Sequence, residues 1–209
     1  MKKIPLILFI VLVIFALLQC DKTKPPVKPD TTKPDYWFPI GEKYNWLYVS
    51  LGQDCIATED TFSITYTGKK DRYIDGISHS GWDFVSSPGG DTSFYYLEAD
   101  TIFFKKDPLL SLPPYHILVG PVEAGKFWKD RSPYNYDYSI VGFEDLYSSV
   151  AGITYAHCVK IKRTLPDDNK SKYYWWSPEY GRVKEMDFQS EQCLGGEELE
   201  NLDKTHATP

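Results

Sequence analysis

Residues 153–162 read Ile153-Thr154-Tyr155-Ala156-His157-Cys158-Val159-Lys160-Ile161-Lys162 and decide the fold class. Larger apolar or aromatic residues fall at every second position, which places one face of an extended strand on a core and the other in water. The same period of two recurs over residues 62–67 and 134–140. The pattern predicts amphipathic β-strands in an antiparallel arrangement.

Shorter strands are predicted around these three. Six of them are expected at residues 44–51, 81–86, 92–97, 101–105, 173–177 and 182–188. Turn signals rich in Gly, Pro and Asp separate them, at 67–69, 75–76, 88–90, 166–169 and 179–181. No long window shows the 3.6-residue period of an amphipathic helix. Residues 36–209 are therefore expected to form one all-β, mainly antiparallel domain.

Two segments are less regular. The apolar loop from Pro108 to Pro121 is expected to strap across the sheet. Residues 189–209 are weakly patterned and are expected to hold a last strand or a short helix before the end of the chain.

The N-terminus carries an export signal. Lys2 and Lys3 precede an apolar run from Ile4 to Leu18, which is shorter than the roughly 20 residues of a spanning helix. The run stops at Gln19-Cys20, as in a bacterial lipoprotein signal occupying residues 1–19. We predict that Cys20 is lipidated and anchors the protein in a bacterial envelope membrane, facing the periplasm or the outside. Plain cleaved secretion and an uncleaved anchor are the alternatives.

A polar linker follows the signal. After Cys20, the linker of residues 20–35 consists of Pro, Lys, Thr and Asp with a single larger apolar residue, Val27, a composition that favours an extended tether over a packed segment. Without residues 1–19 the chain has 21 Lys and Arg against 29 Asp and Glu, a net charge of −8. An acidic body disfavours nucleic acid as a partner, because its phosphates are bound by Lys and Arg.

Three cysteines remain if Cys20 is lipidated. Outside the cytosol they allow one disulfide and one spare thiol, and the sequence does not choose the pair. Cys55 with Cys193 is the preferred pairing, because both fall in predicted loops whereas Cys158 falls in a strand. No Cys-x-x-Cys or His-x-Cys spacing indicates zinc, and no metal or cofactor is expected.

Several stretches resemble a known group of proteins. They are residues 36–41 with Trp46 and Tyr48, residues 125–128, residues 150–158, and the segment Tyr173 to Lys184. Together they are similar to secreted bacterial proteins of the DUF3108 and TapB-like groups over most of residues 36–188. The resemblance implies the open or half β-barrel of the lipoprotein-localisation factors. Its motifs are strand and turn signatures, so no catalytic residue is carried over.

Catalytic patterns are weak. His79, His116, His157 and His206 show no metal-binding or catalytic spacing. His157 lies on the apolar face of its predicted strand and is interpreted as a core histidine. No Gly-x-Ser-x-Gly nucleophile elbow occurs, and the acidic pairs 59–60, 144–145 and 167–168 are interpreted as solvated acids at turns or strand ends. A hydrolase is therefore disfavoured.

Consecutive aromatic residues offer the best candidate site. Tyr173, Tyr174, Trp175 and Trp176 must point to both faces of one strand, and Tyr95 with Tyr96 repeats this situation. One pair could face a cavity and bind a ligand. The preferred alternative is a two-sided aromatic core beneath the loop 108–121.

Three functions remain. The leading hypothesis is a non-enzymatic envelope lipoprotein that binds an apolar or envelope ligand, such as a lipid, or a partner protein on its concave face. The second is a surface sugar-binding module that uses Trp175, Trp176 and neighbouring tyrosines. The third, a hydrolase, is the least favoured.

Overall fold

The computed structural model describes residues 29–38, 44–107, 113–130, 135–164 and 169–203. The predicted signal sequence, Cys20 and the first part of the predicted tether lie outside these residues. Residues Thr31–Pro209 form one compact unit. No described helix has the length and apolar character needed to cross a membrane.

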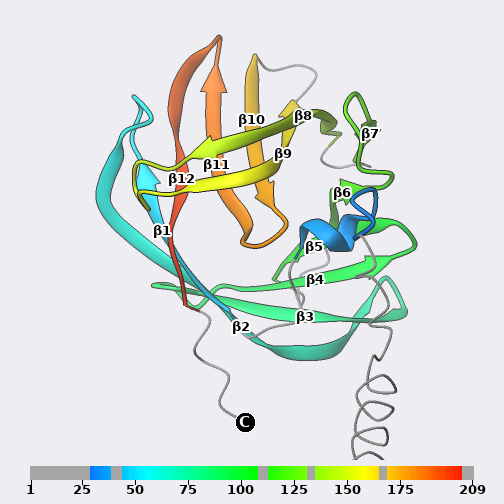
Figure 1. Cartoon of the computed structure of the whole chain (residues 1–209). Helices are drawn as coiled ribbons and strands as arrows, with labels where there is room; N and C mark the ends of the chain where they lie inside the picture. Colours follow the sequence, from blue (N-terminus) through cyan, green and yellow to red (C-terminus); the bar gives the residue numbers. More distant parts are fainter. Residues whose placement is uncertain (1–28, 39–43, 108–112, 131–134, 165–168, 204–209) are drawn as a thin grey trace, which may run out of the picture. The chain divides into compact units, whose positions relative to one another are not determined.

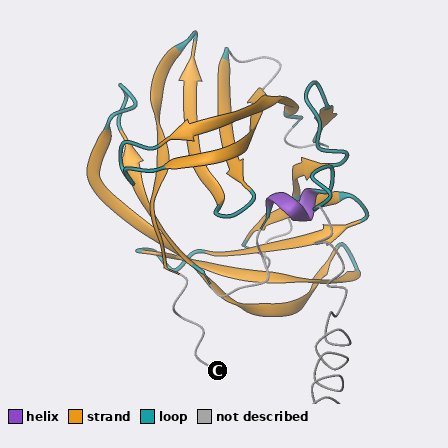
Figure 2. Cartoon of the chain, viewed as in Figure 1, coloured by secondary structure: helices purple, strands orange, loops and turns teal. Residues whose placement is uncertain are grey.

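The described residues of this unit form a twelve-stranded antiparallel sheet with one short 3-10 helix, η1 (Pro34–Trp37) (Figures 1 and 2). The first six strands are β1 (Asn45–Leu51), β2 (Ala57–Ile74), β3 (Ile77–Ser87), β4 (Thr92–Glu98), β5 (Thr101–Lys106) and β6 (Tyr115–Val119). The last six are β7 (Phe127–Lys129), β8 (Asp137–Tyr147), β9 (Thr154–Thr164), β10 (Lys170–Ser177), β11 (Gly181–Gln189) and β12 (Gln192–Asp203). The predicted all-β, antiparallel class is confirmed.

The sheet curls into a nearly closed barrel. Its strand order is β6-β5-β4-β3-β2-β1-β12-β11-β10-β9-β8-β7, so β6 and β7 form its two edges. Side chains join these edges: the backbone N–H of His116 donates to Asp130 Oδ1 at 2.9 Å, and Trp128 Nε1 donates to the His116 carbonyl at 3.2 Å. Among the described residues, no backbone ladder connects β6 to β7. The expectation of an open barrel is confirmed, with this seam as its opening.

Local sequence accounts for the long hairpin of β2 and β3. Asp75 and Gly76 connect the strands, and both have positive φ, as a two-residue hairpin turn requires. The turn expected at residues 67–69 is wrong, because Gly68 lies inside β2 at a change of register between Tyr66 and Gly68. Its φ of +137° fits a bulge that glycine accommodates without strain.

The barrel interior is filled by aromatic and branched side chains. The central cluster is buried and consists of Trp37, Ile102, Leu118, Val122, Trp128, Tyr138, Ile140, Val159, Ile161 and Trp176. Trp37 is completely buried and donates from Nε1 to the Thr31 carbonyl at 2.9 Å. The N–H of Val122 donates to the Thr32 carbonyl at 2.8 Å. Thr31 and Thr32 are therefore bonded to the body of the compact unit.

A second apolar layer lies on the other side of β10. The β8–β9 hairpin folds across β10, β11 and β12 (Figure 1), so that Tyr155 donates to the Leu199 carbonyl at 3.0 Å and its ring lies 5.0 Å from Tyr180. Cys158 and Trp175 are buried in the same cluster as Tyr155 and Leu199. At Trp175 and Trp176 the strand of consecutive aromatics is thus covered on both faces, and on this side the cover is the hairpin, where the loop 108–121 was expected.

The interpretation of His157 as a core residue is wrong. Its backbone has φ of +53°, and the register of β8 and β9 shifts between Glu144 and Leu146 opposite it. This bulge breaks the alternation, so that the adjacent residues Cys158 and Val159 are both buried and His157 is exposed. The His157 ring stacks on Phe143 with centroids 5.3 Å apart.

Two other segments differ from expectation. Residues 115–119 of the expected strap form β6, the sheet edge, while residues 108–112 lie outside the described part of the chain. The weakly patterned C-terminal segment forms β12, which pairs with both β1 and β11.

A disulfide joins Cys55 and Cys193, whose Cα atoms are 5.9 Å apart. Cys158 is the spare thiol among the described residues, and it is buried. Burial, with the nearby charges of Asp145 and Glu144, raises the pKa of the Cys158 thiol to about 12.

Candidate functional site

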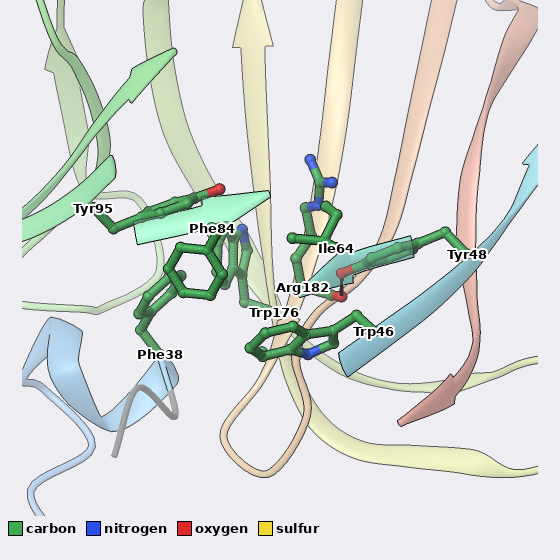
Figure 3. A pocket seen from close by; sticks show the side chains of 9 residues that line it. Phe38, Trp46, Tyr48, Ile64, Phe84, Tyr95, Trp176 and Arg182 are labelled. Carbon is green, nitrogen blue, oxygen red and sulfur yellow. Dashed lines mark hydrogen bonds between the residues drawn. The ribbon is translucent and has the colours of Figure 1, made fainter. Parts of the chain in front are cut away.

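The barrel interior contains a small apolar pocket at the centre of the aromatic residues (Figure 3). Its volume is about 30 Å³, room for one or two water molecules. The pocket is lined by Phe38, Trp46, Tyr48, Ile64, Phe84, Tyr95, Trp176, Gly181 and Arg182. In Figure 3 the Arg182 side chain extends upward, away from Trp46 and Phe38 below.

A larger pocket opens beside this one, at the mouth of the barrel. Its volume is about 430 Å³, and it shares Ile64, Tyr95 and Arg182 with the small pocket. Phe62 and Phe104 add apolar wall, and Lys106, Asp91 and Glu197 add charge at the rim. We refer to the two pockets together as the mouth site.

Strand pairing explains the aromatic wall of the mouth site. Tyr95 on β4 lies opposite Phe104 on β5, with ring centroids 4.9 Å apart. Tyr48 on β1 lies opposite Phe62 on β2, and their rings stack at 5.2 Å. Cross-strand aromatic pairs of this kind hold each other in place. The wall is therefore largely preformed.

A network of charges forms the opposite wall. Arg182 bonds Glu185 at 2.7 Å and also contacts Glu197, while Lys172 contacts Glu185 and lies 3.1 Å from Asp187. The side chains of Arg182 and Glu197 are each 19% exposed. Such a partly buried network fixes the Arg182 side chain, because each charge would be costly to bury alone.

The two carboxylates beside Arg182 differ in acidity. Burial acts to raise the pKa of Glu185, but the charges of Arg182 and Lys172 outweigh it, so this pKa lies below its ordinary value. For Glu197, burial outweighs the opposing charge of Arg182 and raises the pKa. Glu197 is therefore the carboxyl group of this wall that takes up a proton more readily.

Two neutral donors line the same site. Burial raises the pKa of Tyr95 to about 12, so its hydroxyl stays protonated at neutral pH. The Nε1 atom of Trp176 is buried and has no hydrogen-bond partner among the described residues. A buried N–H without an acceptor is costly, which makes this atom a natural partner for a ligand oxygen.

The structure separates the six aromatic residues singled out in the sequence. Trp176 and Tyr95 line the mouth site, and Tyr174 packs against the central cluster, of which Trp176 is a member. Tyr173 and Trp175 line a hollow on the opposite face of the sheet. Tyr96 lines neither: it is buried in a separate small cluster with Ile74 and Phe94.

Sequence reasoning missed the charged half of the mouth site. Arg182 and Glu197 stand in adjacent strands far from Tyr95 in the chain, and no spacing connects them. The alternation within β11 could place Arg182 on a sheet face, but not opposite the aromatic wall.

The acidic pair Glu144-Asp145 lies within β8, and both residues have specific roles. Glu144 accepts a hydrogen bond from Trp175 Nε1 at 2.6 Å and pairs with Lys160 at 3.2 Å. The Asp145 side chain accepts from the His157 N–H at 2.7 Å, which holds the bulge. The interpretation of these acids as merely solvated is wrong.

A buried polar cluster at the seam contains residue types that also occur in catalytic sites. Asp130 Oδ1 lies 2.7 Å from His116 Nδ1, and Tyr138 donates to Asp130 Oδ2 at 3.1 Å. Among the described residues, no serine, threonine or cysteine side chain bonds His116, and no group of three potential metal ligands exists. Asp130 instead ties the edges of the barrel together.

Comparison with known proteins shows distant likenesses. No protein-family model matches the chain, so the resemblance to the DUF3108 and TapB-like groups is not confirmed, and no curated protein matches its sequence. A solved structure of a protein described as exported, with a YmcC-like fold, from Bacteroides fragilis is 12% identical with a TM-score of 0.48. The match covers 78% of this chain and 96% of the Bacteroides fragilis chain.

Two further solved structures are similar. One, described as a lipoprotein from Parabacteroides distasonis, is 18% identical with a TM-score of 0.46, covering 80% of this chain and 98% of its own. The other is MucB in complex with the periplasmic part of MucA, 15% identical with a TM-score of 0.38, covering 81% of this chain and 53% of its own.

Proposed function

We propose that this chain is a non-enzymatic lipoprotein of the bacterial envelope, anchored through Cys20, that binds an amphipathic small molecule in the mouth site. The observation that carries the proposal is the buried Nε1 of Trp176, which lacks an acceptor among the described residues at the edge of a pocket. Its position suits a ligand that brings an oxygen into the barrel.

The size and chemistry of the mouth site support a ligand with two kinds of surface. A volume of about 430 Å³ lies within the usual range of small-molecule sites. Phe62, Ile64 and Phe104 offer contact to an apolar portion, and Arg182 with Glu197 offers contact to a polar one. The inner pocket of about 30 Å³ is too small for an acyl chain, so the ligand lies in the mouth and sends one polar atom inward.

The test begins with the full-length protein extracted from membranes. Mass spectrometry under native conditions should find a stoichiometric small molecule beyond the lipid attached at Cys20. Ser93 lines the mouth and is half-buried, so Ser93→Trp should fill the pocket and abolish this species. Thr61→Trp, at an exposed position of β2 outside the pocket, is the matched control and should retain it.

Two outcomes contradict the proposal. One is a protein that carries no second molecule and does not bind a panel of phospholipids, fatty acids and muropeptides. The other is ligand retention by the Ser93→Trp variant. A partner protein on the concave face, the other occupant expected from sequence, would instead co-purify with the Thr61→Trp variant and be lost from the Ser93→Trp variant.

A further inference from the structure

A second hollow lies on the outer face of the sheet, away from the mouth site. It has a volume of about 870 Å³ and is formed by strands β8 to β11 with the turn that follows β11. We call it the outer groove. The proposed function uses none of the residues that line it.

The floor of the outer groove is aromatic. Tyr173 lies between Trp175, at 6.1 Å, and Phe188, whose ring meets it edge-on at 5.6 Å. Tyr173 and Phe188 are half-buried and Trp175 is buried. Flat rings with one side reachable from solvent contact the C–H face of a sugar ring well.

Lysines surround this floor. The Nζ atoms of Lys160 and Lys162 lie 5.5 and 5.7 Å from the centre of the Tyr173 ring, and Lys170 lines the same groove. Lys160 is paired with Glu144, whereas Lys162 makes no ion pair with a described residue. Lys162 therefore places a positive charge beside the Tyr173 ring, in a chain with a net charge of −6. The local charge therefore favours an anionic ligand.

The backbone of the groove excludes a common mode of peptide binding. β10 is paired with β9 on one side and with β11 on the other, so its ladder groups are already occupied. A peptide cannot be added there as an extra strand. Recognition must come from side chains, and Thr164, Asn169, Ser171 and Ser190 supply donors and acceptors suited to hydroxyl groups.

We propose that the outer groove binds an acidic saccharide, with a sugar ring on Tyr173 and Phe188 and its carboxylate at Lys162. This inference is independent of the mouth site and of the ligand proposed for it. The observations that carry it are the position of Lys162 beside an aromatic floor and the side-chain hydroxyl and amide groups that line the groove.

The experiment uses two probes that differ only at the carboxyl group, which is charged in one and a neutral methyl ester in the other. Oligomers of galacturonic acid and the same oligomers with methyl-esterified carboxylates are titrated into the full chain by calorimetry. The acid form should bind, the ester should bind at least about fivefold more weakly, and added salt should weaken the acid form, because exposed charge pairs are screened. Binding should persist in the Ser93→Trp variant, which separates this site from the mouth site.

Variants test the residues. Lys162→Gln should weaken binding of the acid oligomer roughly fivefold, as expected for one exposed charge pair, and leave ester binding unchanged. Lys69→Gln, an exposed lysine on β2 outside the groove, is the matched control and should have no effect. Tyr173→Leu should weaken the binding of both probes, and circular dichroism should confirm that the variant is folded.

Three results overturn the proposal. They are absence of binding at millimolar oligomer, equal binding of acid and ester, and loss of affinity in Lys69→Gln as large as in Lys162→Gln. Binding of anionic phospholipid vesicles through Lys162 in place of the oligomer would assign the groove to a membrane surface and would also overturn it.

Discussion

Replacing Trp175 and Trp176 in turn by alanine tests whether both faces of β10 are packed. The two side chains point to opposite faces of the strand, yet they are only 6% and 4% exposed. A buried aromatic side chain removes about 200 Å² from water, which at about 25 cal/mol per Å² corresponds to roughly 5 kcal/mol as an upper value. Each alanine variant should therefore lose about 3–5 kcal/mol of unfolding free energy.

Phenylalanine at the same two positions gives a finer comparison. Trp175→Phe removes the hydrogen bond to Glu144, a contribution of about 1–2 kcal/mol that is reduced because the Glu144 side chain is 44% exposed. Trp176→Phe removes a buried N–H that has no acceptor among the described residues, which partly offsets the lost ring. Phenylalanine should thus be tolerated better at position 176.

Urea unfolding monitored by circular dichroism measures all four variants. Alanine variants whose stabilities differ by more than about 2 kcal/mol would refute the two-sided core, because one face would then be largely unpacked. A Trp176→Phe variant less stable than Trp175→Phe would show that Trp176 Nε1 has an acceptor in the folded protein.

Three further outcomes are expected. Replacing Cys55 and Cys193 together by serine should cost about 4–5 kcal/mol, because the disulfide closes 138 residues, and a loss in calorimetry below about 1 kcal/mol would contradict this. The hydrogen bond from Trp175, aided by Lys160 and opposed by burial, holds the pKa of Glu144 below its ordinary 4.5, so its contribution to stability is present above that pH and lost as the pH falls through the lowered pKa. Glu144→Gln should accordingly be less stable than the parent at pH 7 and match it in strong acid, and a pH-independent difference in urea unfolding would argue against the carboxylate. Cys158, with its raised pKa and full burial, should resist iodoacetamide at pH 8 until urea unfolds the protein, and rapid labelling of the native protein in mass spectrometry would show that the second apolar layer opens.

Period-two patterns predicted most of the strands, because a strand with one buried face carries an apolar residue at every second position of its own sequence. The two-residue turn at Asp75-Gly76 was predictable for the same local reason, since both positions need positive φ. Gly68 carries a similar signal but serves a bulge, and nothing within residues 62–70 distinguishes a bulge from a turn. A bulge also explains why His157 is exposed and Cys158 is buried, the opposite of the prediction. One extra residue in a strand turns each later side chain to the other face of the sheet.

The mouth site was only half predictable. Consecutive aromatic residues in β10 and β4 indicated that both faces of these strands carry aromatic side chains. Of these residues, Trp176 and Tyr95 line the same pocket in the barrel. The partner wall depends on the pairing of β11 with β12 and on the closure of the sheet. Which side of the sheet Arg182 faces depends on a register shift between Trp175 and Trp176, which is a property of the assembled sheet.

The strand order has a consequence for how the chain reaches this fold. Among the described strands, every neighbouring pair is consecutive in sequence except β1 with β12, where Asn45 lies opposite Asp203. Two six-stranded meanders can therefore assemble from local contacts, whereas joining them requires closure of nearly the whole chain. We expect this single pairing to form late and to limit the folding rate. Cys55 follows β1 and Cys193 lies in β12, so the disulfide stands at that junction and, once formed, keeps an opened barrel from separating into halves.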